Sequence, residues 1–406
     1  MLIATTALLV LGLLPFVYYL LSAYCAVAYF RDMRKVPTPQ APFMPPASIL
    51  KPVRGLDHQA YENFASFCRL DYPEYELVFA MSNVDAQVCA VIEKLRADFP
   101  ACSIRLITEV PNLGTNDKVN NLCQLVQRAK YDFIVMSDSD VRVEPDYLKE
   151  VIAPFADPEV GAVTALYKSV SAGNLASNLS ALGMYMDSAP SALVAKKIER
   201  KMCFAFGWTM ATSKKQLDGI GGWKEMANYH SDDFEFGKRI AQCGRRVELM
   251  AKPVSMVFPK ETLAEYFSRE LRWSIGLRSV RPLAYWGLAF THGLPWALLA
   301  ATLAASINSV TLAVSYPIAY LILRVGLTWT IGKWGIGDRK LLRILWLVPL
   351  HDAINVVVWL LGFFSDKIMW RGLSYHVKHG MLIPIPSDSQ PLAPRPKSIS
   401  TVVSKA

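Results

Sequence analysis

Residues 131–140 read YDFIVMSDSD, and this stretch decides the fold. An apolar run of strand length ends abruptly in two acids, Asp138 and Asp140, which are one residue apart. Parallel α/β sheets present polar groups in this way at the carboxyl ends of their strands, where ligands bind. In an extended chain both carboxylates point the same way, so they can share a divalent cation that holds a diphosphate. A surface turn is the alternative, because Asp and Ser are common in turns.

Apolar runs and helical periodicity alternate along the residues before this stretch. The predicted strands are 48–51, 76–81 and 104–107, and the predicted helices are 59–69, 87–99 and 118–129. Strands that alternate with helices of this size form a mostly parallel sheet covered on both faces. The sequence therefore predicts an α/β fold whose strand ends open on one crevice.

The N-terminal residues predict a membrane anchor. Of the 406 residues, 52% are hydrophobic, which is high for a soluble enzyme. Residues 2–30 contain no Asp, Glu, Lys or Arg and exceed the roughly 20 residues that cross a bilayer. Arg31, Arg34 and Lys35 follow at once, which places the N-terminus outside and the next segment in the cytosol. A cleaved signal peptide is the alternative, but it expects basic residues before a shorter apolar stretch.

Composition divides the rest of the chain. The expected parts are an anchor at 1–30, a Pro-rich linker at 31–46, a cytosolic domain at 47–281, a membrane region at 282–364 and a tail at 365–406 that is disordered from about 383. The membrane region suits about three spans, two of them joined by a tight turn near 306–309. Three spans would place the tail outside, whereas Lys367, Arg371 and Lys378 favour a cytosolic tail. A re-entrant or interfacial last segment would reverse the tail's side.

Charged residues near the last apolar segments have two interpretations. Arg324 is expected to begin a basic cytosolic loop. His351 and Asp352 lie near the start of the apolar segment 344–364. They can be functional intramembrane groups, or they can lie at the membrane interface.

Cysteine usage and net charge exclude several classes. The seven cysteines form no CxxC pair, and no His lies at metal-ligand spacing, so neither a disulfide scaffold nor a zinc site is indicated. The net charge of +9 is concentrated beside membrane segments, without a basic run that interleaves aromatic residues. We therefore expect no nucleic acid, and instead anionic lipid headgroups and a phosphorylated substrate as the counter-charges.

The predicted crevice collects polar groups from several strand ends. Lys51, Asp85 and Asp138 each follow or end a predicted strand. The loop 112–121 directly precedes a helix, where free backbone N–H groups and Lys118 suit an anion. A plain N-cap by Asn or Asp explains this loop equally well.

Two later clusters add an acid pair and an Arg-Trp element. Asp232 and Asp233 begin a helix, where acids are favoured by the helix dipole. A paired acid is also a good general base, because its like-charged neighbour raises its affinity for a proton. Arg269, Arg272 and Trp273 lie just before the membrane region. Arg272 can pair with phosphate while the Trp273 ring stacks or anchors at the interface, or the cluster can be an ordinary basic and aromatic belt at the interface.

Taken in order, these clusters closely resemble the ceramide glucosyltransferase family, which are inverting glycosyltransferases with a GT-A fold. The segments that carry the resemblance are LKPVRGLD (50–57), LDYPEYE (70–76), KVNNL (118–122), DSD (138–140), DD (232–233) and RELRW (269–273). The resemblance covers nearly the whole chain, including its membrane layout. Bacterial hopanoid-linked glycosyltransferases share the same segments.

The resemblance implies a role for each of the main acids. Asp138 is implied to help hold a UDP-sugar through Mg²⁺ or Mn²⁺, with Asp140 as the second acid on the metal side. Asp233 matches the family's third Asp, which is implied to deprotonate the acceptor hydroxyl as it attacks the anomeric carbon.

The remaining site residues are also assigned by the resemblance. Arg272 and Trp273, with Arg269, match the motif that is implied to hold the diphosphate and shape the acceptor pocket. The first acidic motif departs from the family: members often carry consecutive acids followed by Pro, whereas this chain has SNVDA at 82–86. Asp85, implied to bind the nucleotide, therefore stands one place off the matching position.

The expected function is transfer of a sugar, with UDP-glucose as first choice, to the hydroxyl of a membrane lipid, with ceramide as first choice. The alternative is transfer of N-acetylglucosamine to a hopanoid or another bacterial lipid. A processive polysaccharide synthase is disfavoured, because it expects Gln where this chain has Arg269 and more spans. The expected location is the bacterial inner membrane, or the Golgi or endoplasmic reticulum in a eukaryote, with the catalytic domain in the cytosol.

Overall fold

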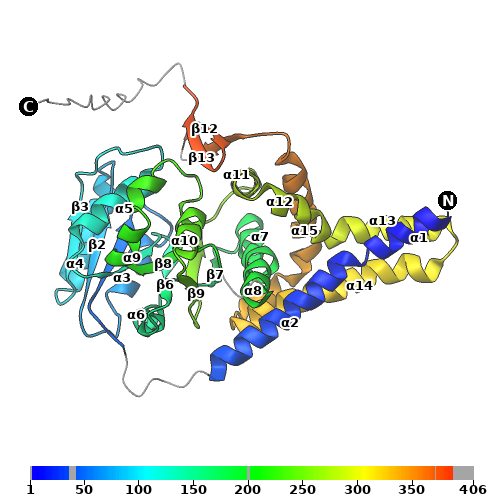
Figure 1. Cartoon of the computed structure of the whole chain (residues 1–406), viewed down its shortest axis with the longest axis horizontal. Coiled ribbons are helices and arrows are strands. Elements are labelled where there is room, and N and C mark those ends of the chain that lie inside the picture. Colours follow the sequence, from blue (N-terminus) through cyan, green and yellow to red (C-terminus); the bar gives the residue numbers. More distant parts are fainter. Residues whose placement is uncertain (1, 36–42, 199–201, 371, 387–406) are drawn as a thin grey trace, which may run out of the picture.

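The computed structural model describes residues 2–35, 43–198, 202–370 and 372–386. Part of the predicted linker and all of the tail beyond residue 386 lie outside these ranges. An α/β domain forms one side of the molecule, and apolar helices that include both α2 and α14 extend from the other (Figure 1). A small C-terminal sheet lies beside α11, between these two parts (Figure 1).

A seven-stranded sheet forms the centre of the α/β domain, in the order β3-β2-β1-β4-β8-β6-β9. Its strands are β1 (Ala47–Pro52), β2 (Tyr75–Ala80), β3 (Ile104–Ile107), β4 (Phe133–Ser137), β6 (Val160–Thr164), β8 (Thr209–Ser213) and β9 (Arg246–Leu249). β8 pairs antiparallel with β4 and β6, and the other pairings are parallel. The predicted mostly parallel α/β sheet is confirmed. The apolar run before Asp138 is the buried strand β4, as expected for a strand covered on both faces.

Helices cover the sheet. In chain order they are α3 (Ala60–Phe67), α4 (Ala86–Asp98), α5 (Asp117–Arg128), α6 (Tyr147–Ile152), the 3₁₀ turn η1 (Ala153–Ala156), α9 (Lys214–Gly219), the 3₁₀ turn η3 (Trp223–Met226) and α10 (Asp232–Gln242). In α5, Val119, Leu122 and Leu125 are buried, whereas Gln124 and Gln127 turn away from the core. This helical spacing of apolar residues seats α5 against β1 and β2.

A second layer joins the α/β domain to the apolar helices. The sheet β5-β10-β7 consists of β5 (Val141–Arg142), β10 (Val254–Phe258) and β7 (Tyr167–Ser171). The helices are α7 (Leu175–Gly183), the π-helical turn η2 (Met184–Ser188), α8 (Ala189–Ile198) and the long α11 (Leu263–Val280). α11 begins with a capping box between Thr262 and Glu265, so its first turn is well defined.

Two helical stretches, 5–34 and 310–335, are long and apolar enough to cross a membrane. The apolar helices are α1 (Leu2–Leu11), α2 (Leu14–Lys35), α12 (Pro282–Gly287), η4 (Leu288–Phe290), α13 (Gly293–Ser306), α14 (Val310–Trp329), the π-helical turn η5 (Thr330–Gly335), the 3₁₀ turns η6 (Lys340–Arg343) and η7 (Leu345–Leu347), and α15 (Val348–Leu361). The segments 282–290 and 293–306 form a third candidate span, bent by 43°. The chain reverses between α13 and α14 at Asn308, whose φ is 58°. The helix α15 is shorter than the spans.

A buried polar cluster joins this membrane part to the α/β domain. Arg324 lies inside α14, rather than in the basic loop that the sequence suggested. Its guanidinium donates to Asp352 Oδ1 at 2.7 Å, to Asp187 Oδ1 at 3.1 Å and to the carbonyl of Met186 at 2.8 Å. His351 bonds Asp187 Oδ2 through Nε2 at 2.8 Å. Because Asp187 is on η2, these polar groups fix η2 against α14 and α15.

The C-terminal sheet consists of β11 (Lys367–Trp370), β12 (Leu373–Lys378) and β13 (Met381–Pro384). It packs on α11 and hydrogen-bonds the α/β domain: Leu382 N donates to Asn228 O at 2.7 Å, and His230 N donates to Gly380 O at 2.8 Å. These hydrogen bonds place β13 and the turn before it against the α/β domain. Residues 383 and 384, at the start of the segment expected to be disordered, belong to β13.

Candidate functional site

Asp138 and Lys118 meet at the carboxyl end of β4. The ammonium of Lys118, in the first turn of α5, lies 2.6 Å from Asp138 Oδ1 and 3.9 Å from Asp232 Oδ2. It also donates to the carbonyl of Gly207 at 3.1 Å. Burial disfavours the charged form of Lys118, but Asp138 and Asp232 outweigh this effect and raise its pKa. Lys118 is therefore a fixed cation between the two acid clusters that the sequence singled out.

Lys51, in β1, hydrogen-bonds two residues at the carboxyl end of β4. It is fully buried, with its ammonium 3.7 Å from the centre of the Phe67 ring. The ammonium donates to the Asp138 carbonyl at 2.7 Å and to Ser137 Oγ at 3.2 Å. Burial lowers the pKa of Lys51 to about 7, against the attraction of Asp138 and Asp140. The Lys51 ammonium therefore positions the backbone of Asp138, and the donor-binding role expected for Lys51 stays a prediction.

Asp140 is an acid whose buried negative charge a bound cation would stabilise. Its Oδ1 is buried and accepts no hydrogen bond from the described residues. Burial, together with the charges of Asp138 and Asp57, raises its pKa to about 7. Asp57, on the loop after β1, accepts a hydrogen bond from Ser139 Oγ and so faces the same triplet. A buried carboxylate crowded by two others is a costly arrangement that a cation would offset.

The chemistry of these carboxylates suits a divalent cation, but their side chains do not converge on one point in the described structure. Carboxylate oxygens are the ligands that Mg²⁺ prefers, and the unsatisfied Oδ1 of Asp140 is such a ligand. Within the described ranges, however, no three His, Cys, Asp or Glu side chains are arranged to hold a metal ion. Lys118 presents the positive charge nearest to Asp138.

Asp233 lies in the first turn of α10 with its carboxylate fixed by two backbone donors. Gly207 N donates to Oδ2 at 2.9 Å, and Phe234 N donates to Oδ1 at 2.7 Å. Burial and the charge of the neighbouring Asp232 raise the pKa of Asp233 to about 6. Lys118 and the two backbone donors act in the opposite direction. The result is a carboxylate that is ionised at neutral pH and still has an appreciable affinity for a proton.

Asn116 caps α5. Its side chain accepts from the backbone N–H of Lys118 at 3.0 Å and of Val119 at 3.4 Å, and its amide donates to Asp232 Oδ1 at 3.3 Å. The loop 112–121 therefore contains the N-cap that one of its two interpretations predicts, because the Asn116 side chain accepts hydrogen bonds from backbone N–H groups at the start of α5. Lys118 supplies the charge beside Asp138, and Asn116 ties the start of α5 to the start of α10.

The predicted Arg-Trp element lies on α11, and its two arginines have different surroundings. The Arg269 guanidinium is paired closely with Glu261, bonds Ser180 Oγ and lies 3.5 Å from Glu270. Arg269 is thus held by α7 and the loop before α11. The Arg272 guanidinium instead lies 5.6 Å from the centre of the Trp370 ring, at the C-terminal sheet.

Trp273 lies on α11 beside Arg269, and Asp85 lies at the start of α4. Trp273 is partly exposed, with Arg269 5.4 Å from its ring centre. Asp85 is the N-cap of α4, where its Oδ1 accepts from the backbone N–H of Gln87 at 2.8 Å and of Val88 at 3.3 Å. Its place at a helix start explains this use of the carboxylate. The roles predicted for both residues stay predictions.

Sequence reasoning missed several neighbours of the site. Asp57 lies in the segment 50–57, for which the sequence suggests no role at the site. Gly207 and His230 lie outside every acidic motif. The structure gives a reason for glycine at position 207: a Cβ there would lie 3.1 Å from both Asp233 Oδ2 and Lys118 Nζ. No local pattern signals this contact, because Gly207 and Lys118 belong to distant segments.

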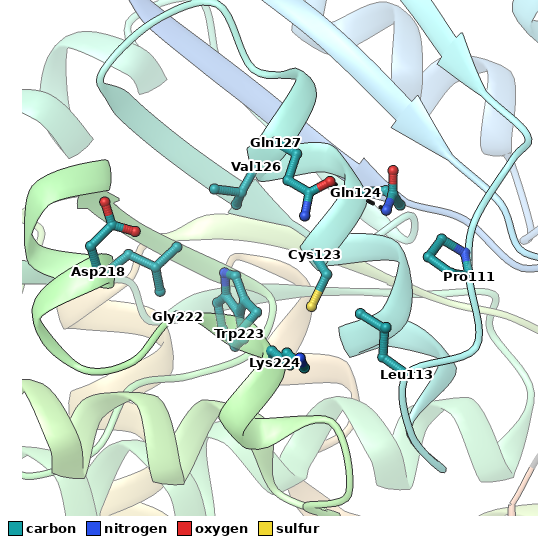
Figure 2. Close-up of a pocket in the computed structure, with 11 residues that line it drawn as sticks. Pro111, Leu113, Cys123, Gln124, Val126, Gln127, Asp218, Gly222, Trp223 and Lys224 are labelled. Carbon is teal, nitrogen blue, oxygen red and sulfur yellow. Dashed lines mark hydrogen bonds between the residues drawn. The ribbon is translucent and has the colours of Figure 1, made fainter. Parts of the chain in front are cut away.

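A cavity of about 310 Å³ lies on the other face of α5. Figure 2 shows Cys123 and Gln124 from α5, with Trp223 and Lys224 from η3, around this space. None of the sequence-predicted site residues lines it. The candidate site is therefore the acid cluster at the ends of β4, α5 and α10.

Two curated proteins are similar in sequence to this chain. The chain is 23% identical over 245 residues to Ceramide glucosyltransferase 1 of Caenorhabditis elegans, covering 57% of this chain and 50% of that protein. It is 24% identical over 269 residues to Beta-monoglucosyldiacylglycerol synthase of Synechocystis sp., covering 65% of this chain and 53% of that protein. The chain spans about half the length of these curated relatives.

A solved structure supports the fold assignment. The mannosyltransferase PcManGT of Pyrobaculum calidifontis, in complex with GDP-Man and Mn²⁺, superposes with a TM-score of 0.52 at 19% identity. The match covers 85% of this chain and 99% of that chain, which indicates a shared GT-A-like fold. Residues 7–383 match glycosyl transferase family 21. This chain therefore belongs to glycosyl transferase family 21.

Proposed function

We propose that this protein transfers a sugar from a UDP-sugar, with UDP-glucose as first choice, to the hydroxyl of a membrane lipid, with ceramide as first choice. The observation that carries the proposal is the placement of Asp233. Asp233, whose pKa is raised to about 6, accepts a hydrogen bond from Gly207 N, and the carbonyl of the same Gly207 accepts one from Lys118, whose ammonium contacts Asp138. This group of residues lies on a domain attached to apolar helices.

Asp233 is the proposed general base. A lipid hydroxyl is barely acidic at neutral pH, so its attack on the anomeric carbon requires a group that accepts the proton. Asp233 is ionised at pH 7, and its two backbone hydrogen bonds hold the carboxylate in one orientation. Attack by the hydroxyl with departure of UDP in a single displacement inverts the anomeric centre. The proton passes from the acceptor oxygen to the Asp233 carboxylate.

Asp138 and Asp140 are the proposed seat of a Mg²⁺ or Mn²⁺ ion that holds the UDP diphosphate. When bound, such a cation supplies positive charge to the leaving diphosphate. Lys118 adds a fixed positive charge beside Asp138, and Arg272 is the proposed partner of the diphosphate from α11. Lys51 holds the backbone of Asp138 in place.

The lipid acceptor is proposed from the attachment of the site to the membrane part. α11 carries Arg272 and leads directly into the apolar segment that begins at α12. The buried cluster around Arg324 fixes the membrane helices against η2, so the acceptor side of the domain keeps a constant position relative to the bilayer. A lipid hydroxyl can then approach Asp233 without leaving the membrane surface.

A panel of donors and acceptors tests the proposal. The full chain in lipid nanodiscs is supplied with UDP-glucose, UDP-N-acetylglucosamine or UDP-galactose, and the nanodiscs contain ceramide, diacylglycerol or a hopanoid alcohol. UDP release and glycolipid mass are followed with Mn²⁺ and with EDTA. We expect glucosylceramide and cation-dependent UDP release. Transfer of N-acetylglucosamine to the hopanoid would select the alternative, and the absence of any glycolipid would refute the proposal.

A further inference from the structure

The C-terminal sheet has an apolar core of its own, built on α11. Ile275 from α11 packs with Ile368, Val377 and Leu382 of the sheet, and all four side chains are buried. Trp370 packs at the edge of this cluster. A three-stranded sheet of this size needs such support, because short isolated strands are barely stable. The sheet is therefore seated on the helix that carries the Arg-Trp element.

The same sheet also binds the segment that leads into the catalytic acid pair. The turn between β12 and β13 has positive φ at His379 and Gly380, as type I′ hairpin turns require. Gly380 accepts a hydrogen bond from His230 N at 2.8 Å and donates to Ser279 Oγ at 2.7 Å. The C-terminal sheet thus links α11 to the residues immediately before Asp232.

Trp370 lies where these two attachments meet. Its ring centre is 5.6 Å from the Arg272 guanidinium carbon and 5.7 Å from the centre of the His230 ring. His230 is buried against Gly276, where a Cβ would lie only 2.6 Å from His230 Nδ1. Burial lowers the pKa of His230 to about 3, so its ring is neutral and does not repel Arg272. The face of an indole attracts a guanidinium at this distance.

We infer that the C-terminal sheet is part of the donor site, in which Trp370 positions the Arg272 guanidinium for the UDP diphosphate. This inference rests on the proposed function. Arg272 is on a long side chain with many rotamers, and an aromatic face restricts these before the ligand arrives. Trp370 acts through Arg272 and is a positioning residue, so its loss should affect donor affinity more than the proton transfer at Asp233.

Replacement of Trp370 by Leu and by Phe separates positioning from packing. Both side chains are apolar and can support the cluster on α11, but only Phe presents an aromatic face to Arg272. Met369→Leu is the matched control, because Met369 is the adjacent residue of β11 and its side chain is mostly exposed. UDP affinity is measured by calorimetry, donor KM and kcat by glycolipid formation, and melting temperature by fluorescence.

For Trp370→Leu we expect UDP affinity to fall about 3- to 30-fold, with donor KM rising in parallel, which is the range from an exposed to a desolvated cation–π contact. Trp370→Phe should stay within about 3-fold of the wild type, and Met369→Leu should match it. In an Arg272→Met background, Trp370→Leu should have little additional effect on UDP affinity.

Unchanged UDP affinity in Trp370→Leu, or equal losses in the Leu and Phe variants, would overturn the inference. An undiminished effect of Trp370→Leu in the Arg272→Met background would also overturn it. The wild type separates this inference from the proposed function. A wild-type protein that binds no UDP and forms no glycolipid contradicts the function itself, whereas a functional wild type with an indifferent Trp370 contradicts only the inference.

Discussion

Asp233→Asn is expected to stop sugar transfer while leaving UDP binding nearly unchanged. An amide cannot accept the acceptor's proton, so the variant lacks the proposed general base. Loss of general-base catalysis costs about 10²- to 10⁴-fold in rate, or about 3–5 kcal/mol of transition-state stabilisation. UDP affinity should change by less than about 3-fold, because the proposed donor contacts come from Asp138, Lys118 and Arg272.

The structure also predicts a side effect of this substitution. The Asn oxygen can accept from one of the two backbone donors, Gly207 N or Phe234 N, but its NH₂ group would face the other. One unsatisfied buried donor costs about 1–3 kcal/mol of folding stability. The melting temperature must therefore be measured with the rate, so that a loss of folded protein is not mistaken for a loss of base catalysis.

Asp232→Asn is the matched control. Asp232 raises the proton affinity of Asp233 by its charge, and its Oδ1 contact with Asn116 can be kept by an Asn oxygen. This variant should retain substantial kcat and shift the acidic limb of the rate profile to lower pH. Glycolipid formation under saturating donor and acceptor is the assay. More than a tenth of wild-type kcat in Asp233→Asn, or an equal loss in Asp232→Asn, would refute the reasoning.

Four further outcomes are expected. Because the Asp233 pKa is raised to about 6 and the base must be ionised, kcat/KM should fall as pH decreases through about 6, and a flat profile down to pH 5 would contradict this. Asp85→Asn should keep both the cap of α4 and donor KM, whereas a large increase in donor KM would show that the carboxylate binds nucleotide. Gly207→Ala should lower kcat at least about tenfold, because its Cβ would press on the Asp233 carboxylate, and normal kcat would show that the neighbours can yield. Asp352→Ala should lower the free energy of unfolding in detergent by about 3–5 kcal/mol, because Arg324 would stay buried without its main partner. An Arg324→Met/Asp352→Leu double variant should recover most of this loss. An unchanged melting temperature for Asp352→Ala would show that the pair is dispensable.

The central part of the site follows from the sequence because it depends on a general property of parallel sheets. An apolar strand that ends in acids brings Asp138 to the edge where ligands bind, and a helix that starts at the same edge brings Lys118 beside it. The order of strands and helices was sufficient to predict the α/β fold. These conclusions needed only residues that are near one another in sequence.

Other features depend on contacts between distant segments. Lys51 is the last residue of a predicted strand, which suggests a crevice residue, but its side chain is fully buried and its ammonium lies on the Phe67 ring. Arg324 reads as the start of a loop, yet its partners Asp187 and Asp352 allow it to remain inside an apolar helix. Trp370 meets Arg272 only because the C-terminal sheet folds back onto α11. No local sequence pattern predicts these contacts between distant residues.

The anomeric configuration of the lipid product shows whether Asp233 catalyses a single displacement. The full chain in nanodiscs that contain ceramide is incubated with UDP-glucose and Mn²⁺, and the glycolipid is examined by NMR at its anomeric proton. Because UDP-glucose carries an α-linked sugar, single displacement with Asp233 as base predicts a β-linked glucosyl lipid from the wild type and almost none from Asp233→Asn. An α-linked product, or release of free glucose without any glycolipid, would contradict the account.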